Sequence, residues 1–220
     1  ALGILQQIVE NALQLLELGA NAAGGVENGR RVTDHAHAGE PTPWSEPGTR
    51  KAYLSYFLPL NVARLRAVWR EVERFLPASE ISEIWDFGSG LGATQWTLED
   101  QTAFAPRPFY CVEISSSAVN EHLALAALAP CQWRPLHRTT PRPQQQALAV
   151  FSYSFLEMQK NLPDLLDFDH ILILEPSTRE AGRALMNWRS EWLKEGFTAL
   201  APCTHDKACP LLTHSGRDWC

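Results

Sequence analysis

Three glycines within five residues carry the clearest chemical signal in this sequence. Gly88, Gly90 and Gly92 follow a short apolar run, residues 81–87, which is typical of a buried strand that enters a turn and then a helix. Glycine lacks a Cβ, so such a turn can bend sharply and a ligand can approach its backbone. The N–H groups and the positive helix end that meet there favour an anionic ligand group. We therefore predict a cofactor site at this turn.

Two acidic residues flank the turn and indicate which cofactor it binds. Asp86 stands two residues before the first glycine, and Glu113 ends the next predicted strand, 21 residues after Gly92. Asp86 is placed to hold the glycine loop or an ammonium group, and Glu113 to accept hydrogen bonds from two ribose hydroxyls. The resulting Asp-x-Gly-x-Gly-x-Gly form is that of class I methyltransferases, so S-adenosylmethionine is the predicted cofactor, with its methionine carboxylate at the turn.

A dinucleotide site is the alternative for the same residues. Gly88, Gly90 and Ala93 match a loose Gly-x-Gly-x-x-Ala pattern, which would make the chain an NAD(P)-binding oxidoreductase. Asp86 and the third glycine favour S-adenosylmethionine over this alternative. A turn whose glycines are purely structural is a further interpretation.

The expected substrate side of the sheet offers two polar candidates. Tyr153 and Glu157 follow the predicted strand at 147–152, and either could orient a methyl acceptor or transfer a proton. Packing among Phe151, Phe155 and Leu156 is the alternative role for both. The sequence has no Asn-Pro-Pro-Tyr run that would hold an exocyclic amine, so it does not specify the acceptor.

A cysteine-rich tail forms a second candidate site. Cys203, Cys209 and Cys220 lie within the last eighteen positions, with His205 and His214 between them. Thiolate clusters bind soft metals, which predicts zinc or an iron–sulfur cluster, with either histidine as a candidate further ligand. Because the spacing contains no Cys-x2-Cys pair, three free cysteines in a loop remain the alternative.

The elements around these sites predict an α/β fold. After Pro77, short apolar runs alternate with helical patterns, which indicates a Rossmann-like, mainly parallel sheet with helices on both faces. We divide the chain into an N-terminal helical region (1–76, with a loop at about 20–50), a cofactor-binding domain (77–201) and the cysteine-rich tail (202–220). Helical patterns cover 1–19 and 51–76, with Pro59 as a break or the start of the longer helix. The predicted strands lie at 81–87, 108–113, 132–136, 147–152, 170–175 and 197–201, and the predicted helices between them at 93–104, 116–128, 156–166 and 179–195.

Composition excludes several classes of protein. A hydrophobic content of 45% and a charged content of 20% are ordinary for a globular domain, and no run approaches the ~20 apolar residues of a membrane span. The formal net charge of -6 disfavours free nucleic acid as a partner. An odd number of cysteines without a secretory signal favours a reducing compartment such as the cytoplasm.

Five runs of residues carry a family resemblance, and they lie at 52–59, 86–96, 151–157, 175–179 and 201–211. The last two, Glu-Pro-Ser-Thr-Arg and Ala-Pro-Cys-Thr-His-Asp-Lys-Ala-Cys-Pro-Leu, are the most specific. Together they resemble the methyltransferase-like family of ribosomal small-subunit assembly factors, known from mitochondria and with bacterial relatives.

The resemblance implies a class I methyltransferase fold, cofactor binding at the three glycines and Glu113, and association with the small ribosomal subunit or its rRNA. It also implies a four-cysteine iron–sulfur site that includes Cys203, Cys209 and Cys220, with the fourth cysteine further downstream in a longer tail. Family members are assembly factors whose methyl transfer is in question, so a catalytically silent cofactor- and metal-binding assembly factor is the alternative to an active enzyme. The resemblance places a eukaryotic member in the mitochondrial matrix.

Overall fold

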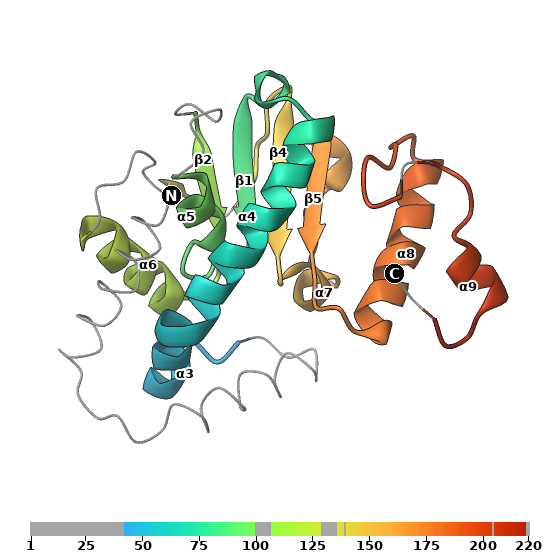
Figure 1. Ribbon diagram of the computed structural model, residues 1–220. Coiled ribbons are helices and arrows are strands. Elements are labelled where there is room, and N and C mark those ends of the chain that lie inside the picture. Colours follow the sequence, from blue (N-terminus) through green and yellow to red (C-terminus); the bar gives the residue numbers. More distant parts are fainter. Residues whose placement is uncertain (1–41, 100–106, 129–135, 139, 204, 219–220) are drawn as a thin grey trace.

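Five parallel strands form the centre of the molecule (Figure 1). The computed structural model describes residues 42–99, 107–128, 136–138, 140–203 and 205–218, so the predicted helix at 1–19 and Cys220 lie outside the described residues. The strand order β3-β2-β1-β4-β5 reverses at β1, and ligands bind at such a reversal in open α/β sheets. The strands are β1 Glu83–Phe87, β2 Phe109–Val112, β3 Leu136–His137, β4 Ala147–Ser152 and β5 His170–Leu174. The predicted Rossmann-like α/β fold is confirmed.

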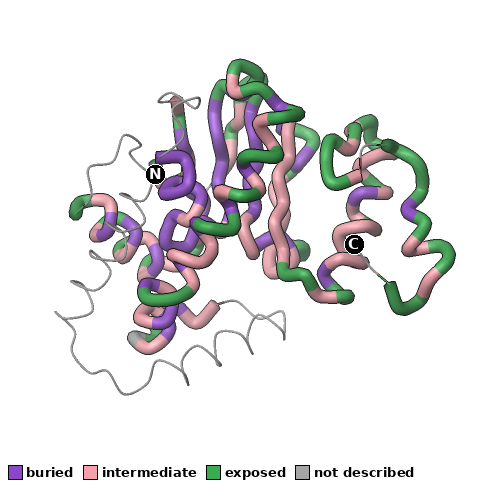
Figure 2. Tube along the Cα trace, viewed as in Figure 1, coloured by how far each residue is buried: buried purple, intermediate pink, exposed green. Residues whose placement is uncertain are grey.

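Helices cover both faces of the sheet because the buried strands are apolar on both sides. On one face Ile84 of β1 packs with Trp69 of α4. On the other, Trp85 and Phe87 belong to a cluster against which Trp188 of α8 packs. Figure 2 shows the central strands buried between these layers. The helices are α3 Pro47–Ala52, α4 Leu58–Phe75, α5 Ala93–Leu98, α6 Ser116–Leu128, α7 Phe155–Met158, α8 Arg179–Lys194 and α9 Pro210–His214.

The helical segment before the sheet continues through its proline. A π-helical stretch at Tyr53–Phe57 joins α3 to α4, and the Leu58 N–H donates to the carbonyl of Tyr53, five residues back. Pro59 lies in the first turn of α4 and directly follows the π-helical stretch, which accommodates a residue that has no N–H to donate to the preceding turn. The interpretation of Pro59 as the start of the longer helix is therefore confirmed.

Two predicted elements are wrong, and two, the helix at 93–104 and the strand at 132–136, are only partly described. Residues 197–201 form no strand, because β5 pairs with β4 and no described strand pairs with this segment. The predicted helix at 156–166 shrinks to α7 and a 3-10 turn at Leu165–Asp167, since Pro163 disfavours helical backbone at the residue before it. Of the predicted strand at 132–136 the described part begins at Leu136. None of the described helices is long and apolar enough to cross a membrane.

Candidate functional site

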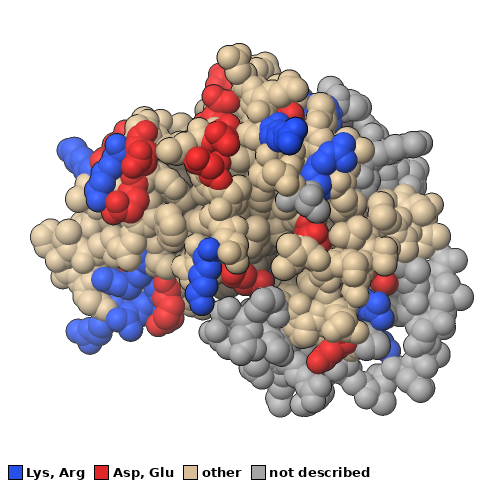
Figure 3. Space-filling view, turned by 180° about the vertical axis from the view of Figure 1, so that it is seen from behind, with Lys and Arg blue, Asp and Glu red and all other residues tan. Residues whose placement is uncertain are grey.

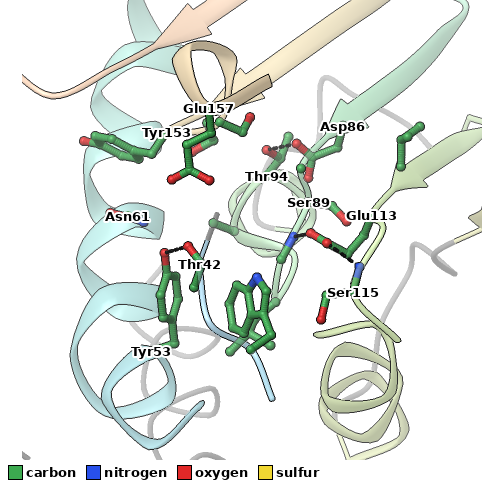
Figure 4. A pocket seen from close by; sticks show the side chains of 18 of the residues that line it. Thr42, Tyr53, Asn61, Asp86, Ser89, Thr94, Glu113, Ser115, Tyr153 and Glu157 are labelled. Carbon is green, nitrogen blue, oxygen red and sulfur yellow. Dashed lines mark hydrogen bonds between the residues drawn. The ribbon is translucent and has the colours of Figure 1, made fainter. Parts of the chain in front are cut away.

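A cavity of about 330 Å³ opens where the carboxyl ends of β1, β2 and β4 meet. Figure 4 shows Asp86 and Glu113 at this place, whereas the ring of Tyr153, which also lines the cavity, extends toward α4. Glu157 of α7 also lines the cavity. The sheet therefore brings together the predicted cofactor-binding acids and both predicted substrate-side residues in one cavity.

The three glycines of the turn have different surroundings. All have positive φ angles, 64° at Gly88, 51° at Gly90 and 80° at Gly92, which strain any residue with a Cβ. A Cβ on Gly88 would lie 2.5 Å from the Ser154 Cβ, and one on Gly92 would lie 2.2 Å from His122 Nε2. Gly88 and Gly92 thus make room for protein side chains, and Gly92 is absent from the cavity lining.

Gly90 lines the cavity, and its N–H orients the nearby Glu113 carboxylate. The Gly90 N–H donates to Glu113 Oε2 at 3.0 Å, and the Ser115 N–H donates to Oε1 at 2.8 Å. Each carboxylate oxygen keeps a further lone pair. Glu113 is therefore held in one orientation with acceptor capacity left for two ligand hydroxyls.

Asp86 is buried at the back of the same cavity. Thr94 Oγ1 donates to its Oδ1 at 3.0 Å, whereas Oδ2 is buried and has no hydrogen-bond partner. Burial raises the pKa of Asp86 to about 7, and the Glu113 carboxylate adds to the rise. A buried carboxyl oxygen without a partner is costly, so this atom marks a place for a hydrogen-bond donor from a ligand.

The predicted substrate-side residues, Tyr153 and Glu157, each have charged neighbours. Arg64 Nη1 donates to the Tyr153 hydroxyl at 3.3 Å, and the guanidinium carbon lies 5.7 Å from the centre of the Tyr153 ring. Burial raises the pKa of Glu157 to about 7, and the neighbouring Glu175 and Glu113 carboxylates raise it further. Glu157 can therefore exchange a proton near neutral pH.

Part of the cavity wall comes from residues that sequence analysis treated as loop or core. Trp44 lies beside the turn, because its ring would be 3.1 Å from a Cβ on Gly90. The Trp44 and Tyr53 ring centroids are 4.4 Å apart, and burial raises the pKa of Tyr53 to about 12. Thr42 lies 3.5 Å from the Tyr53 hydroxyl. Tyr53 belongs to the helical pattern at 51–76, and this pattern does not indicate that Tyr53 reaches the glycine turn.

The described tail residues do not gather around one point. Cys209 is buried just before α9, Cys203 is half-buried, and His205 and His214 are exposed. Within the described part of the chain, no tail residue belongs to a group of three side chains close enough to share a metal ion, and Cys220 lies outside that part. The predicted tail metal site stays a prediction.

Two arginines of α8, missed in the sequence, hold the tail instead. Arg183 Nη1 donates to the carbonyl oxygens of Leu211, Ser215 and Asp218, at 3.2, 2.9 and 3.1 Å. The buried Arg189 donates to the carbonyls of Lys207 and His205. The tail is thus attached to α8 through its backbone.

The family model described as mitochondrial small ribosomal subunit Rsm22 matches residues 48–220. The human ribosome assembly protein METTL17, mitochondrial, is 24% identical over 193 residues, which cover 76% of this chain and 42% of that protein. The chain therefore spans less than half the length of this curated relative.

Among solved structures, a Pyrococcus horikoshii protein described as a candidate RNA methyltransferase overlaps 73% of this chain and 80% of its own. The TM-score is 0.38 and the sequence identity 14%, so this likeness carries no functional conclusion.

Proposed function

Because the chain belongs to the Rsm22 family of mitochondrial small ribosomal subunit proteins, we propose that it acts in small-subunit assembly and binds S-adenosylmethionine in the cavity at the glycine turn. The observation that carries the cofactor proposal is the buried, unpartnered Oδ2 of Asp86 beside the fixed carboxylate of Glu113. An orphaned acceptor suits the ammonium group of the cofactor, and Glu113 suits its ribose hydroxyls. When bound, the cofactor supplies an electrophilic sulfonium methyl group.

Charge favours this cofactor over a dinucleotide. Asp86, Glu113 and Glu157 line the cavity, and the described lining residues include no lysine or arginine. Such a cavity attracts the ammonium and sulfonium charges of S-adenosylmethionine and repels a pyrophosphate. The proposed NAD(P) alternative is weaker for this reason.

Calorimetric titration of the full chain tests the proposal. We expect S-adenosylmethionine to bind and NAD to release no heat. Asp86→Asn keeps the Thr94 hydrogen bond but removes the charge, so it should weaken binding about tenfold or more, which corresponds to about 1.4 kcal/mol. Asp167→Asn, at an exposed position, is the matched control. Binding of NAD, or undiminished cofactor binding by Asp86→Asn, would overturn this assignment.

Methyl transfer to rRNA is a second candidate function, favoured by the pKa of about 7 at Glu157. Alignment of an acceptor with the methyl group supplies most of the rate in such a reaction, and Glu157 would accept the proton that the acceptor loses. Transfer of labelled methyl groups to immature small subunits tests it. Label above background in the parent protein but not in Glu157→Gln supports an enzyme, whereas label in neither supports a catalytically silent assembly factor.

The surface bears on the proposed ribosomal partner. On the face shown in Figure 3, acidic and basic side chains are interspersed and form no broad basic area. With a net charge of -6, this favours docking on an assembled subunit over binding of free RNA. A co-sedimentation assay with immature small subunits and with protein-free rRNA distinguishes the two. For a eukaryotic source we propose the mitochondrial matrix as the location.

The four-cysteine iron–sulfur site stays a proposal for the tail. Cys203 and Cys209 are free thiols in the described residues, and no step of the function above depends on them. Anaerobic purification followed by iron and sulfide analysis tests it, with Cys203→Ser as the variant that should lose the cluster.

A further inference from the structure

Three side chains converge behind the glycine turn, on the sheet face covered by α5 and α6. Cys111 lies on β2, His137 on β3 and His122 on α6, the helix that connects these two strands. Cys111 and His137 are direct partners in the parallel pairing of β2 and β3, so their side chains lie on the same face of the sheet. One potential ligand atom from each residue lies within 4.8 Å of the others.

Three of the four ring nitrogen atoms in this cluster have no hydrogen-bond partner in the described structure. His122 Nε2 lies 2.8 Å from the amide oxygen of Gln95, which can only accept, so this nitrogen carries the proton. The His122 Nδ1 is then a buried lone pair, and it has no hydrogen-bond partner. Both ring nitrogens of His137 are also buried without a partner. Leaving three buried ring nitrogens unsatisfied is costly for packing alone.

The chemistry of the three groups matches a metal site. A neutral imidazole whose other N–H donates to a protein carbonyl oxygen is the usual form of a histidine ligand, and His122 with Gln95 has this arrangement. Burial lowers the pKa of both His122 and His137, which favours the neutral imidazole that a metal ligand requires. Burial raises the pKa of the Cys111 thiol, and the Asp86 and Glu113 carboxylates contribute to the rise, so a bound metal ion would displace the thiol proton.

We propose that Cys111, His122 and His137 bind one zinc ion behind the glycine turn. Cys and His ligands suit this ion, and tetrahedral zinc places such atoms about 3.4–3.6 Å apart, so small side-chain rotations close the site from its present spacing. The bound ion joins β2, α6 and β3. It also stiffens the cofactor turn, because His122 contacts Gln95 of α5 and fills the space left by Gly92.

Cobalt spectroscopy of the full chain tests this proposal apart from the tail. The chain has five cysteines, so replacing Cys131, Cys203, Cys209 and Cys220 with serine leaves Cys111 as the one thiol. In this variant, made without a histidine tag and stripped with a chelator, we expect one equivalent of Co²⁺ to produce a sulfur-to-cobalt charge-transfer band that Zn²⁺ abolishes. His137→Gln in the same background should weaken cobalt binding at least tenfold, and Arg138→Gln, its exposed neighbour, should leave it unchanged. Absence of the band, or equal cobalt affinity in His137→Gln, would overturn the site.

Thermal unfolding of the otherwise unmodified chain provides a second readout in case the four serine substitutions prevent folding. Zinc at 100 times its dissociation constant should raise the unfolding temperature by about 5 °C or more. We expect this rise in Cys203→Ser and Cys209→Ser but not in Cys111→Ser. A rise that is lost with the tail thiols and kept in Cys111→Ser contradicts the proposal.

Discussion

The Gly90 amide nitrogen lies 3.0 Å from Glu113 Oε2, which ties the turn after β1 to the end of β2. The second carboxylate oxygen is tied to the Ser115 N–H in the same way. A side chain restrained from both sides loses little rotamer freedom when a ligand binds. Glu113 is thus organised for binding before any ribose arrives.

Removing this carboxylate should therefore weaken the cofactor. We expect Glu113→Ala to raise the dissociation constant for S-adenosylmethionine about 10- to 100-fold, because hydrogen bonds to a charged group contribute roughly 1.5–3 kcal/mol. Calorimetric titration measures the change. Glu180→Ala, on the exposed first turn of α8, is the control and should bind as the parent does. Equal affinities in the two variants would contradict the ribose role.

Cofactor binding should depend on pH through Asp86. Its pKa is about 7, so the carboxyl is mostly neutral at pH 6 and mostly ionised at pH 8. If the ionised form binds the ammonium group, affinity should be about tenfold higher at pH 8 than at pH 6. Titrations in Asp86→Asn should lose this dependence. Glu157 has a similar pKa, so Glu157→Gln is the matched variant, and loss of the dependence there would assign it to Glu157 instead.

Stability should fall as pH rises through the same range. Burial raises the folded-state pKa of Asp86, Glu157 and Glu175 to about 7, above ordinary values of 3.8 and 4.5. Between about pH 4 and pH 7 the folded chain holds protons that the unfolded chain releases, so the free energy of unfolding decreases with pH. Urea unfolding at pH 5.5 and 8 measures it. Asp86→Asn should reduce the difference by about 1–3 kcal/mol, whereas Asp167→Asn should preserve it.

Alanine substitutions at two glycines distinguish the energetic cost of backbone strain from that of side-chain crowding. Gly92 and Gly196 both have positive φ, 80° and 98°, but a Cβ on Gly196 would meet nothing within 4 Å. Gly196→Ala should therefore cost about 1–2 kcal/mol of unfolding free energy from strain. Gly92→Ala should cost at least about 2 kcal/mol more, since His122 must move. Equal urea midpoints for the two variants would contradict this expectation, because they would mean that the His122 ring moves aside at little energetic cost.

The arginine contacts of α8 predict which substitution makes the tail detach from α8 more often. Arg183→Met removes three hydrogen bonds to tail carbonyls, so local opening of the tail should become at least tenfold more frequent. Limited trypsin digestion after the exposed Lys207 and Arg217 measures this opening. Lys194→Met serves as control, since Lys194 pairs with the exposed Glu191 on the same helix and not with a tail carbonyl among the described residues. Unchanged cleavage in Arg183→Met would mean that other contacts hold the tail.

Periodicity and spacing predicted the parts of the fold that depend on local sequence. The alternation of apolar runs and helical patterns gave β4 and α6 with their observed bounds and α8 to within one residue. The spacing of Asp86, the glycines and Glu113 located the cavity, because carboxyl ends of neighbouring parallel strands meet.

Features that depend on distant partners could not be predicted in this way. A strand needs a neighbour, so the apolar pattern at 197–201 was insufficient by itself. Trp44 reaches Gly90 from a segment without any motif. Cys111, which belongs to no motif in the sequence, meets His137 only through the register of β2 and β3.

The attachment of the tail to α8 has a consequence for how this region tolerates change. In each of these hydrogen bonds, Arg183 or Arg189 donates to a main-chain carbonyl oxygen, a group that every amino acid has. The attachment of the tail to α8 therefore depends on the backbone path of the tail and not on the identity of its side chains. Replacing a thiol or an imidazole in the tail therefore leaves these anchoring bonds in place, so a change in metal binding there can be measured without detaching the tail from α8.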